Sequence, residues 1–250
     1  LTNDNAISFQ GDEYERAFLH VIGMLNYAAL NQVQSALVEA RKLDNKISYF
    51  KNHPGPVPSR YKDEALGRYI SGLLYEANGE TNDAFIDFRK SIYSFETNPG
   101  VSTPRALPQD AMRTAKRHGM LEEYQAVKNQ FSAQDQPDPL TNEHGEVIIV
   151  FENGFTAYKI EKDLMPFHLE RSSTVNTARV KSLKSNQVAE SQHVKDIGLL
   201  AHGRYQERLP YLKQRALKKK AVKTMLSVGV GALAFIFSGG QSGLVAGKAT

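Results

Sequence analysis

Apolar residues between Gly11 and Phe131 recur at intervals of three and four, which is the period of amphipathic helices. Clusters of proline and glycine interrupt this pattern at several points. The interruptions divide the region into six helices of ordinary length, predicted at Tyr14–Leu30, Gln32–Lys51, Tyr61–Asn78, Thr81–Phe95, Gln109–His118 and Leu121–Gln130. Six helices in tandem pairs indicate a helical repeat domain over residues 1–133.

The clearest repeat unit runs from Leu66 to Ile92 and has the spacing of a tetratricopeptide repeat (TPR). Small residues are expected where its two helices approach each other, and aromatic residues between neighbouring pairs. A glycine is expected at the interhelical turn, because glycine adopts positive φ without strain. The residues that define the unit are Gly72, Tyr75, Gly79, Ala84 and Phe88.

An earlier unit places Tyr27 and Ala36 where Tyr75 and Ala84 stand in the clearest one. It has Asn31 at the turn, and asparagine is the next-best residue for positive φ. A third pair, around Gly119, is shorter and matches the repeat poorly. The alternative to a TPR array is a plain helical bundle in which these small residues coincide by chance.

Stacked helix pairs form a curved surface that commonly binds a peptide or a partner helix, so a protein-binding module is the natural interpretation of this half. The candidate groove residues are Asn26, Arg68 and Tyr69. Tyr27 and Tyr75 are also near this groove, but we expect them to belong to the core.

Residues 134–145 are polar, contain two prolines and lack any period, which predicts a linker. A period of two follows in residues 146–160, around Asn153 and Gly154. Asparagine followed by glycine between β-branched and aromatic residues predicts a hairpin turn. The first strand, Glu146–Phe151, is almost wholly apolar, so we expect both of its faces to be covered. Residues 146–192 are therefore predicted as a small β region.

The second part of that region is rich in serine, asparagine and lysine. Only Thr174–Val180 has the pattern of a strand. We expect residues 165–192 to form a mobile loop with at most one short strand.

A helical period returns near Val194 and continues past Pro210, where a kink is expected. Residues 193–250 are thus predicted as a basic helix followed by an apolar, glycine-rich tail. The polar face of the helix is dense in cations: Arg204, Arg208, Lys213, Arg215, Lys218, Lys219, Lys220 and Lys223. This local concentration explains a net charge of only +4 together with a pI of 9.1.

The cationic run leads directly into an uncharged stretch, Thr224–Gly247, in which Gly239, Gly243 and Gly247 recur every four residues. On a helix these glycines would form a groove for close packing of another helix. The segment could pack on its own domain or on a second subunit, contact a membrane through residues 204–247, or be a mobile tail. The cations could equally form a solvated helix face.

The chemistry-bearing residues argue against an enzyme. The chain has no cysteine, which excludes disulfides, thiol nucleophiles and cysteine-based metal sites. Its seven histidines include no pair spaced for a metal on one helix face, and no phosphate-binding or nucleophile-elbow motif occurs. We therefore expect no catalysis, no cofactor and no metal. We also expect no nucleic-acid partner, because no RNA-binding aromatic signature or helix-turn-helix pattern is present.

Four stretches, in this order, carry a family resemblance: GDEYERAFLHVIGMLNYAAL, RYISGLLYEANGETNDAFIDFRKSI, GEVIIVFENGFTAYK and RYQERLPYLKQRALKKKAVK. Together they resemble an uncharacterised family of bacterial TPR-containing outer-membrane lipoproteins. The resemblance implies an α+β, mainly α fold, with a repeat domain, a β region and a C-terminal helix. It also implies a secreted precursor that is lipidated at a cysteine outside this chain, and no enzymatic activity.

The function expected from these features is a non-enzymatic scaffold on the periplasmic side of the outer membrane. It would bind proteins of the cell envelope, with possible self-association. One alternative is a structural subunit of a large envelope machine, such as a secretion-system or flagellar ring. Another is a cytosolic adaptor whose basic helix touches membrane or nucleic acid.

Overall fold

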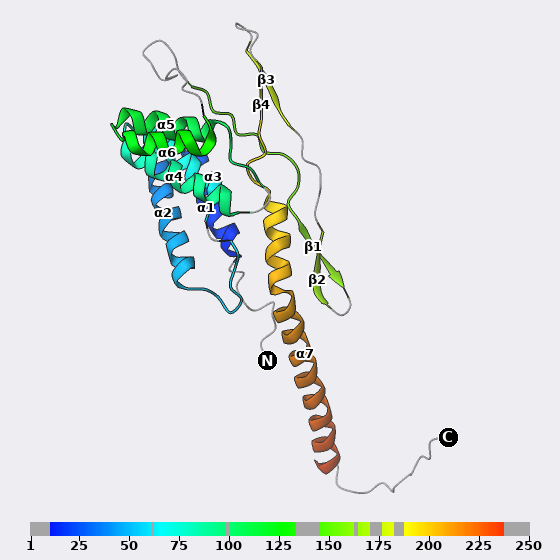
Figure 1. Ribbon diagram of the computed structural model, residues 1–250. Coiled ribbons are helices and arrows are strands. Elements are labelled where there is room, and N and C mark those ends of the chain that lie inside the picture. The colour runs from blue at the N-terminus through cyan, green and yellow to red at the C-terminus, as the bar shows by residue number, and fades with distance from the viewer. Residues whose placement is uncertain are drawn as a thin grey trace.

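The computed structural model describes residues 11–61, 63–98, 101–133, 146–162, 165–170, 177–182 and 188–237. It is mainly helical, with two small antiparallel sheets (Figure 1). The helices of the N-terminal part are α1 (Glu13–Ala29), α2 (Val33–Asn52), α3 (Ala65–Ala77), α4 (Thr81–Thr97), α5 (Ala106–Arg117) and α6 (Leu121–Phe131).

All six helices predicted from the apolar period are confirmed, with two shifted starts. α3 begins at Ala65 instead of Tyr61, because Tyr61 and Asp63 lie in the connection that precedes it. α5 begins at Ala106, three residues earlier than predicted, and takes in Pro108. Proline is tolerated there because the amide groups of the first helical turn have no partner within the helix.

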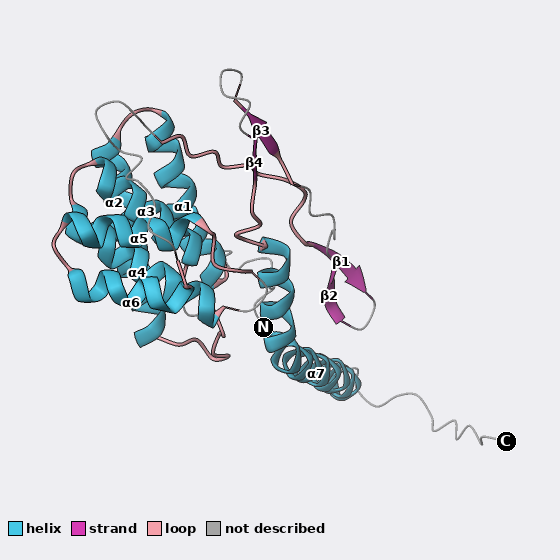
Figure 2. Cartoon of the chain, turned by 45° about the horizontal axis from the view of Figure 1, so that its top comes forward, coloured by secondary structure: helices cyan, strands magenta, loops and turns pink. Residues whose placement is uncertain are grey.

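The six helices pack as three successive pairs: α1 with α2, α3 with α4, and α5 with α6. The second pair contacts both neighbours, since α3 packs on α1 and α2 while α4 packs on α5. Figures 1 and 2 show the resulting stack of helices. Residues 1–133 were predicted as one helical domain, and the described part of that range forms a continuous helical array.

The three interhelical turns share one geometry. Asn31, Gly79 and Gly119 all have positive φ, at 58°, 83° and 76°. The next residue in each turn donates its N–H to a carbonyl five positions back, at 2.8, 2.9 and 2.9 Å. This is the Schellman closure of a helix C-terminus. The prediction that Asn31 replaces glycine at the first turn is confirmed, and the third turn repeats the same geometry.

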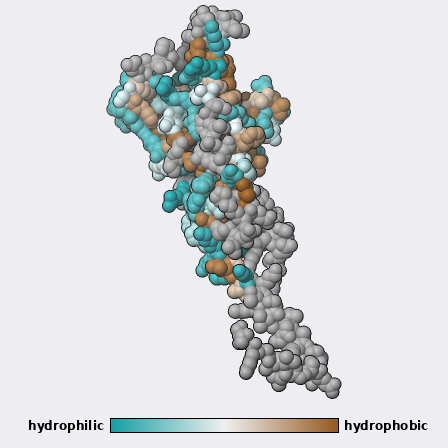
Figure 3. Space-filling model, turned by 90° about the vertical axis from the view of Figure 1, so that its right-hand side faces the viewer, coloured by the Kyte–Doolittle hydropathy of each residue, from teal (hydrophilic) through white to brown (hydrophobic). Residues whose placement is uncertain are grey.

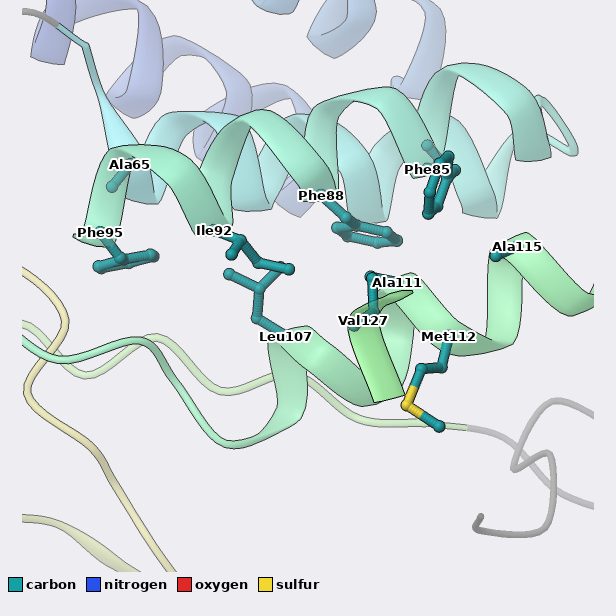
Figure 4. Close-up of a cluster of buried hydrophobic side chains, with 11 residues drawn as sticks. Ala65, Phe85, Phe88, Ile92, Phe95, Leu107, Ala111, Met112, Ala115 and Val127 are labelled. Atoms are coloured by element: carbon teal, nitrogen blue, oxygen red, sulfur yellow. The ribbon is translucent and has the colours of Figure 1, made fainter. Parts of the chain in front are cut away.

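The helical array is held by two adjoining clusters of buried apolar side chains. One lies within α1 and α2 and reaches α3; the other fills the space between α3, α4, α5 and α6 (Figure 4). Phe88 is fully buried in the second cluster, and Tyr75 packs against both clusters. Burying a side chain of this size contributes about 2 kcal/mol or more. The array therefore has one continuous apolar interior.

The β region differs from its prediction. β1 (Tyr158–Lys162) pairs antiparallel with β2 (Met165–Glu170), so that Tyr158 lies opposite Glu170. The hairpin predicted around Asn153 and Gly154 is therefore wrong, although Gly154 does adopt positive φ, at 86°. The loop predicted after residue 165 is also wrong in part. It contains β2 and the antiparallel pair β3 (Arg179–Lys181) and β4 (Val188–Glu190).

Residues 146–157 run as an irregular segment from the helical array to β1, and most of their apolar side chains are exposed. Val147 is 83% exposed and Phe155 87% exposed, which contradicts the expected cover on both faces. A local turn signal cannot form a hairpin alone, since two strands need further packing to be stable. Here Glu146 is held by Arg113 of α5, and the chain then crosses to β1 (Figure 1).

α7 (Ile197–Phe237) is the longest helix, and its N-terminal part packs beside α1 and β2. Tyr205 of α7, Tyr14 of α1 and Leu169 of β2 form a third apolar cluster. Pro210 lies inside the helix as predicted, and the ribbon changes direction part-way along it (Figure 2). The remainder of α7 projects away from the helical array (Figure 1).

Candidate functional site

A buried arginine organises the junction of the first two helix pairs. Arg68 of α3 is 4% exposed, and its Nε lies 3.0 Å from Oδ1 of Asp63. Its guanidinium also pairs with Asp44 of α2 and lies 3.7 Å from Asp87 of α4. Burial raises the pKa of Asp87, although hydrogen bonding to Ser71 and the charge of Arg68 oppose the rise. The cluster thus ties three helices together through one desolvated cation.

A second buried cluster joins α3 to α5. Arg113 donates to both carboxylate oxygens of Glu76, at 2.8 and 2.7 Å, and its Nη1 lies 2.8 Å from Asp110. Tyr69 donates its hydroxyl to the other oxygen of Asp110 at 2.6 Å. Burial raises the pKa of Asp110 to about 6, against the opposing effects of Tyr69 and Arg113.

The same arginine reaches the segment that follows the linker. Nη2 of Arg113 lies 3.5 Å from Oε2 of Glu146. Further along the chain, Gln192 accepts a hydrogen bond from the backbone N–H of Arg105 at 2.7 Å. The chain's own later segments therefore lie against the α3 and α5 side of the array.

The start of α7 is attached through a third buried pair. Lys195 contacts the carboxylate of Glu64, which is 1% exposed and also accepts a hydrogen bond from the Tyr61 hydroxyl. The Lys195 ammonium lies 4.8 Å from the ring centre of Phe18, a cation–π distance. A cavity of about 30 Å³ lies beside this pair. At roughly 10 to 15 Å³ for each water molecule, it has room for about two waters and not for an organic substrate.

Two arginines of α7 hold the N-terminus of α1. Arg204 Nη2 lies 3.0 Å from Glu13 Oε1, and Arg208 Nη1 lies 2.6 Å from Asp12 Oδ1. These acids begin α1, where negative charge is favoured by the helix dipole. Arg204 and Arg208 were predicted as part of the cationic polar face of this helix. The prediction is wrong for Arg204, whose side chain is 8% exposed, whereas that of Arg208 is 37% exposed although it pairs with Asp12.

The charged clusters therefore tie separate helices of the fold together. Every acid and base named above is engaged with an oppositely charged or hydrogen-bonding partner. Within the described ranges, no group of three histidine or acidic side chains is arranged to hold a metal ion.

The residues predicted to define the repeats lie where two helices meet. Ala36, Ala84 and Phe88 are fully buried, and a Cβ added to Gly72 would lie 2.5 Å from the Phe88 ring. Gly79 closes the second turn. Tyr27 and Tyr75 pack against the apolar clusters, in agreement with their expected place in the core.

The three predicted groove residues have different environments. Asn26 is exposed near the end of α1. Tyr69 is partly buried and engaged by Asp110. Arg68 is committed to its internal ion pairs, so its assignment to partner binding is corrected: releasing it would leave buried acids unpaired.

The predicted assembly residues lie in the projecting part of α7 or beyond it. Lys218 and Lys220 are exposed, and Lys219 and Lys223 belong to the same helix. Gly239, Gly243 and Gly247 lie outside the described residues. Among the helices in the described part of the chain, none is both long enough and apolar enough to span a membrane.

Several important residues were not identified from the sequence. A Cβ on Gly67 would lie 2.5 Å from Leu43, so this glycine permits close approach of α3 to α2, yet it lies outside the repeat spacing. Glu64, Asp110 and Arg113 carry no motif. Their only sequence signal is a charged residue between apolar positions. The same pattern is common at solvated helix surfaces, so it does not mark a buried charge.

Comparison of the chain with protein-family models, curated proteins and solved structures found no match.

Proposed function

We propose that this protein is a non-enzymatic, TPR-like scaffold that binds protein partners in a bacterial cell envelope, on the periplasmic side of the outer membrane. The observation that carries the proposal is the shared turn geometry at Asn31, Gly79 and Gly119, which closes three helix pairs in series. A serial array of helix pairs presents an extended surface, and protein binding is the usual role of such surfaces.

The face open to a partner is formed by α2 and α4. Segments of the chain itself lie on the α3 and α5 side, at Glu146 and Gln192. Val38 and Ile86 occupy equivalent positions after their turns and are 41% and 40% exposed. Tyr93 of α4 is 65% exposed. Aromatic residues are enriched at protein interfaces, so Tyr93 and Ile86 are the main candidates for partner contact on this face.

The experiment is cross-linking in the source bacterium followed by purification of the full chain and its partners. The double variant Ile86→Glu and Tyr93→Glu should lose the cross-linked partners while keeping its helical circular dichroism. Leu19→Glu, which places the same charge on an exposed apolar residue of α1 outside this face, is the matched control. Partners retained by the double variant would contradict this binding face.

The envelope location is tested separately by fractionation with a carbonate wash. The lipoprotein resemblance supports an outer-membrane location, and a protein recovered only in the cytosol would contradict it. Recovery in the cytosol would favour the adaptor alternative.

A second candidate, a fixed subunit of a large envelope machine, is favoured by the projection of α7 from the helical array (Figure 1). A subunit should be present in fixed stoichiometry in the purified complex. A free, monomeric protein with unchanged abundance in cells that lack any such complex would argue against this candidate.

A further inference from the structure

The second half of α7 leaves the body of the protein. The apolar residues of α7 that pack against α1 and β2 end at Leu212. Beyond it, Leu217 is 68% exposed and Val222 is 41% exposed. Because Arg204 and Arg208 are neutralised by Asp12 and Glu13, the exposed cationic surface begins near residue 213 and not at residue 204.

Every charged side chain that the structure describes in this exposed stretch, at Lys213, Arg215, Lys218 and Lys220, is a cation. Residues 213–223 contain no acid, and they occupy about 16 Å of helix at 1.5 Å per residue. The helix then continues to Phe237, and Thr224–Phe237 contains no charged residue. The cations of the stretch are Lys213, Arg215, Lys218, Lys219, Lys220 and Lys223.

The cations lie on opposite sides of the helix and are not gathered on one face. At about 100° per residue, Lys218 is turned about 140° from Lys213, and Arg215 is turned about 200° from it. The two exposed apolar residues, Leu217 and Val222, are also about 140° apart. A helix that lies flat on a membrane keeps its cations on one side and its apolar residues on the other. Figure 3 shows hydrophilic and hydrophobic residues interspersed along the described part of the projecting helix.

We propose that residues 213–222 of α7 form a cationic collar that binds the anionic headgroups of a lipid bilayer, with the helix meeting the bilayer end-on. Positive charge on opposite sides of the helix suits a helix surrounded by headgroups, because the long cationic side chains can reach headgroups on more than one side. The exposed Leu217 and Val222 favour a lipid surface over nucleic acid, which would offer them no apolar environment. A second copy placed alongside would bring like charges together.

The test is co-sedimentation of the full chain with vesicles. One set contains phosphatidylcholine and phosphatidylglycerol in equal amounts, and the other contains phosphatidylcholine alone. Binding is expected only to the anionic vesicles, and it should weaken as salt is raised. Each cation near an anionic bilayer contributes roughly a fivefold factor in affinity. The variant Lys213→Gln with Lys218→Gln should therefore bind about 25-fold more weakly.

The matched control is Arg89→Gln with Lys116→Gln. It removes the same net charge from exposed positions of α4 and α5. This control should bind as the unmodified chain does. Equal loss by both double variants, or equal binding to both vesicle types, would overturn the proposal.

Orientation is tested with a polarity-sensitive fluorophore, since the chain has no cysteine of its own. Gln214→Cys and Ala216→Cys place the probe on faces about 200° apart at nearly the same height on the helix. End-on binding predicts the same emission shift at both sites on adding anionic vesicles. A shift at one site only would show a helix that lies flat and would overturn the collar.

Two further outcomes would also overturn it. In the first, the full chain does not bind vesicles but binds duplex DNA, and the Lys213 and Lys218 variant loses the DNA binding. In the second, the full chain forms an oligomer, and the same variant stays monomeric. The proposal does not depend on the function of the helical array, so its failure would leave the partner-binding proposal untouched.

Discussion

Arg204 of α7 and Glu13 of α1 form an ion pair in which Nη2 and Oε1 lie 3.0 Å apart, although 191 positions separate them in the chain. The side chain of Arg204 is 8% exposed and that of Glu13 is 19% exposed. The pair therefore fixes the C-terminal helix to the first helix of the array in a partly desolvated setting.

Replacing Arg204 by alanine should loosen α7, because it leaves Glu13 and Asp12 with fewer cationic partners. We expect the free energy of unfolding to fall by about 2 kcal/mol, between the values for exposed and fully buried pairs. Urea unfolding measures this loss, and hydrogen exchange of the α7 amides should accelerate. Lys213→Ala, beyond the docked part of the same helix, should change stability by less than about 0.5 kcal/mol. Equal effects from the two variants would show that the pair does not hold α7.

Gly72→Ala should destabilise the protein, because the new Cβ would lie 2.5 Å from the Phe88 ring. Overpacking of this kind costs about 1 to 3 kcal/mol, measurable by thermal or urea unfolding. Gly203→Ala on α7 is the matched control, since nothing lies within 4 Å of its added Cβ. It should stabilise the protein by up to about 1 kcal/mol through helix propensity. A stabilising Gly72→Ala would contradict the close packing of α3 on α4.

The stability of the protein should depend on pH through Asp110. Its folded-state pKa is about 6, above the ordinary value near 4, so the folded state binds the proton more tightly than the unfolded chain. This stabilising contribution of Asp110 is present at low pH and is lost as pH rises through about 4 to 6, at a cost of about 3 kcal/mol. Asp110→Asn keeps an acceptor for the Tyr69 hydroxyl and should remove this part of the pH dependence.

The measurement is urea unfolding at about pH 4 and about pH 7. The exposed acid Asp83, replaced by asparagine, provides a control that should follow the unmodified protein. If Asp110→Asn has the same pH dependence as the unmodified protein, another group is responsible.

The backbone amides of residues 147–151 should exchange with solvent at the first labelling time, while those of α3 and α4 stay protected. The reason is that this segment is exposed and lies in no sheet of the described structure. Hydrogen exchange read by mass spectrometry distinguishes the segments. Protection of residues 147–151 comparable to that of β1 would indicate that the hairpin around Asn153 and Gly154 forms after all.

The helices were predictable because their signals are local. The apolar period of three and four marks each buried face, and Gly79 and Gly119 stand where the chain needs positive φ. The β region was predicted less well. A strand pattern shows that a segment can be extended, but it does not show which other segment it pairs with. Gly154 shows the difference: its φ is positive, yet the segments on either side of it do not pair as strands.

The sequence alone therefore determined six helices, three tight turns and a long basic C-terminal helix. Only the tertiary structure decided which cations form ion pairs inside the protein. Arg68, Arg113, Lys195 and Arg204 look like surface charges in the chain, and each is engaged by acids from distant parts of the sequence. Those pairings depend on how the helices are placed relative to one another. The relative placement of the helices is set by many weak contacts between residues far apart in sequence. No local sequence pattern predicts it.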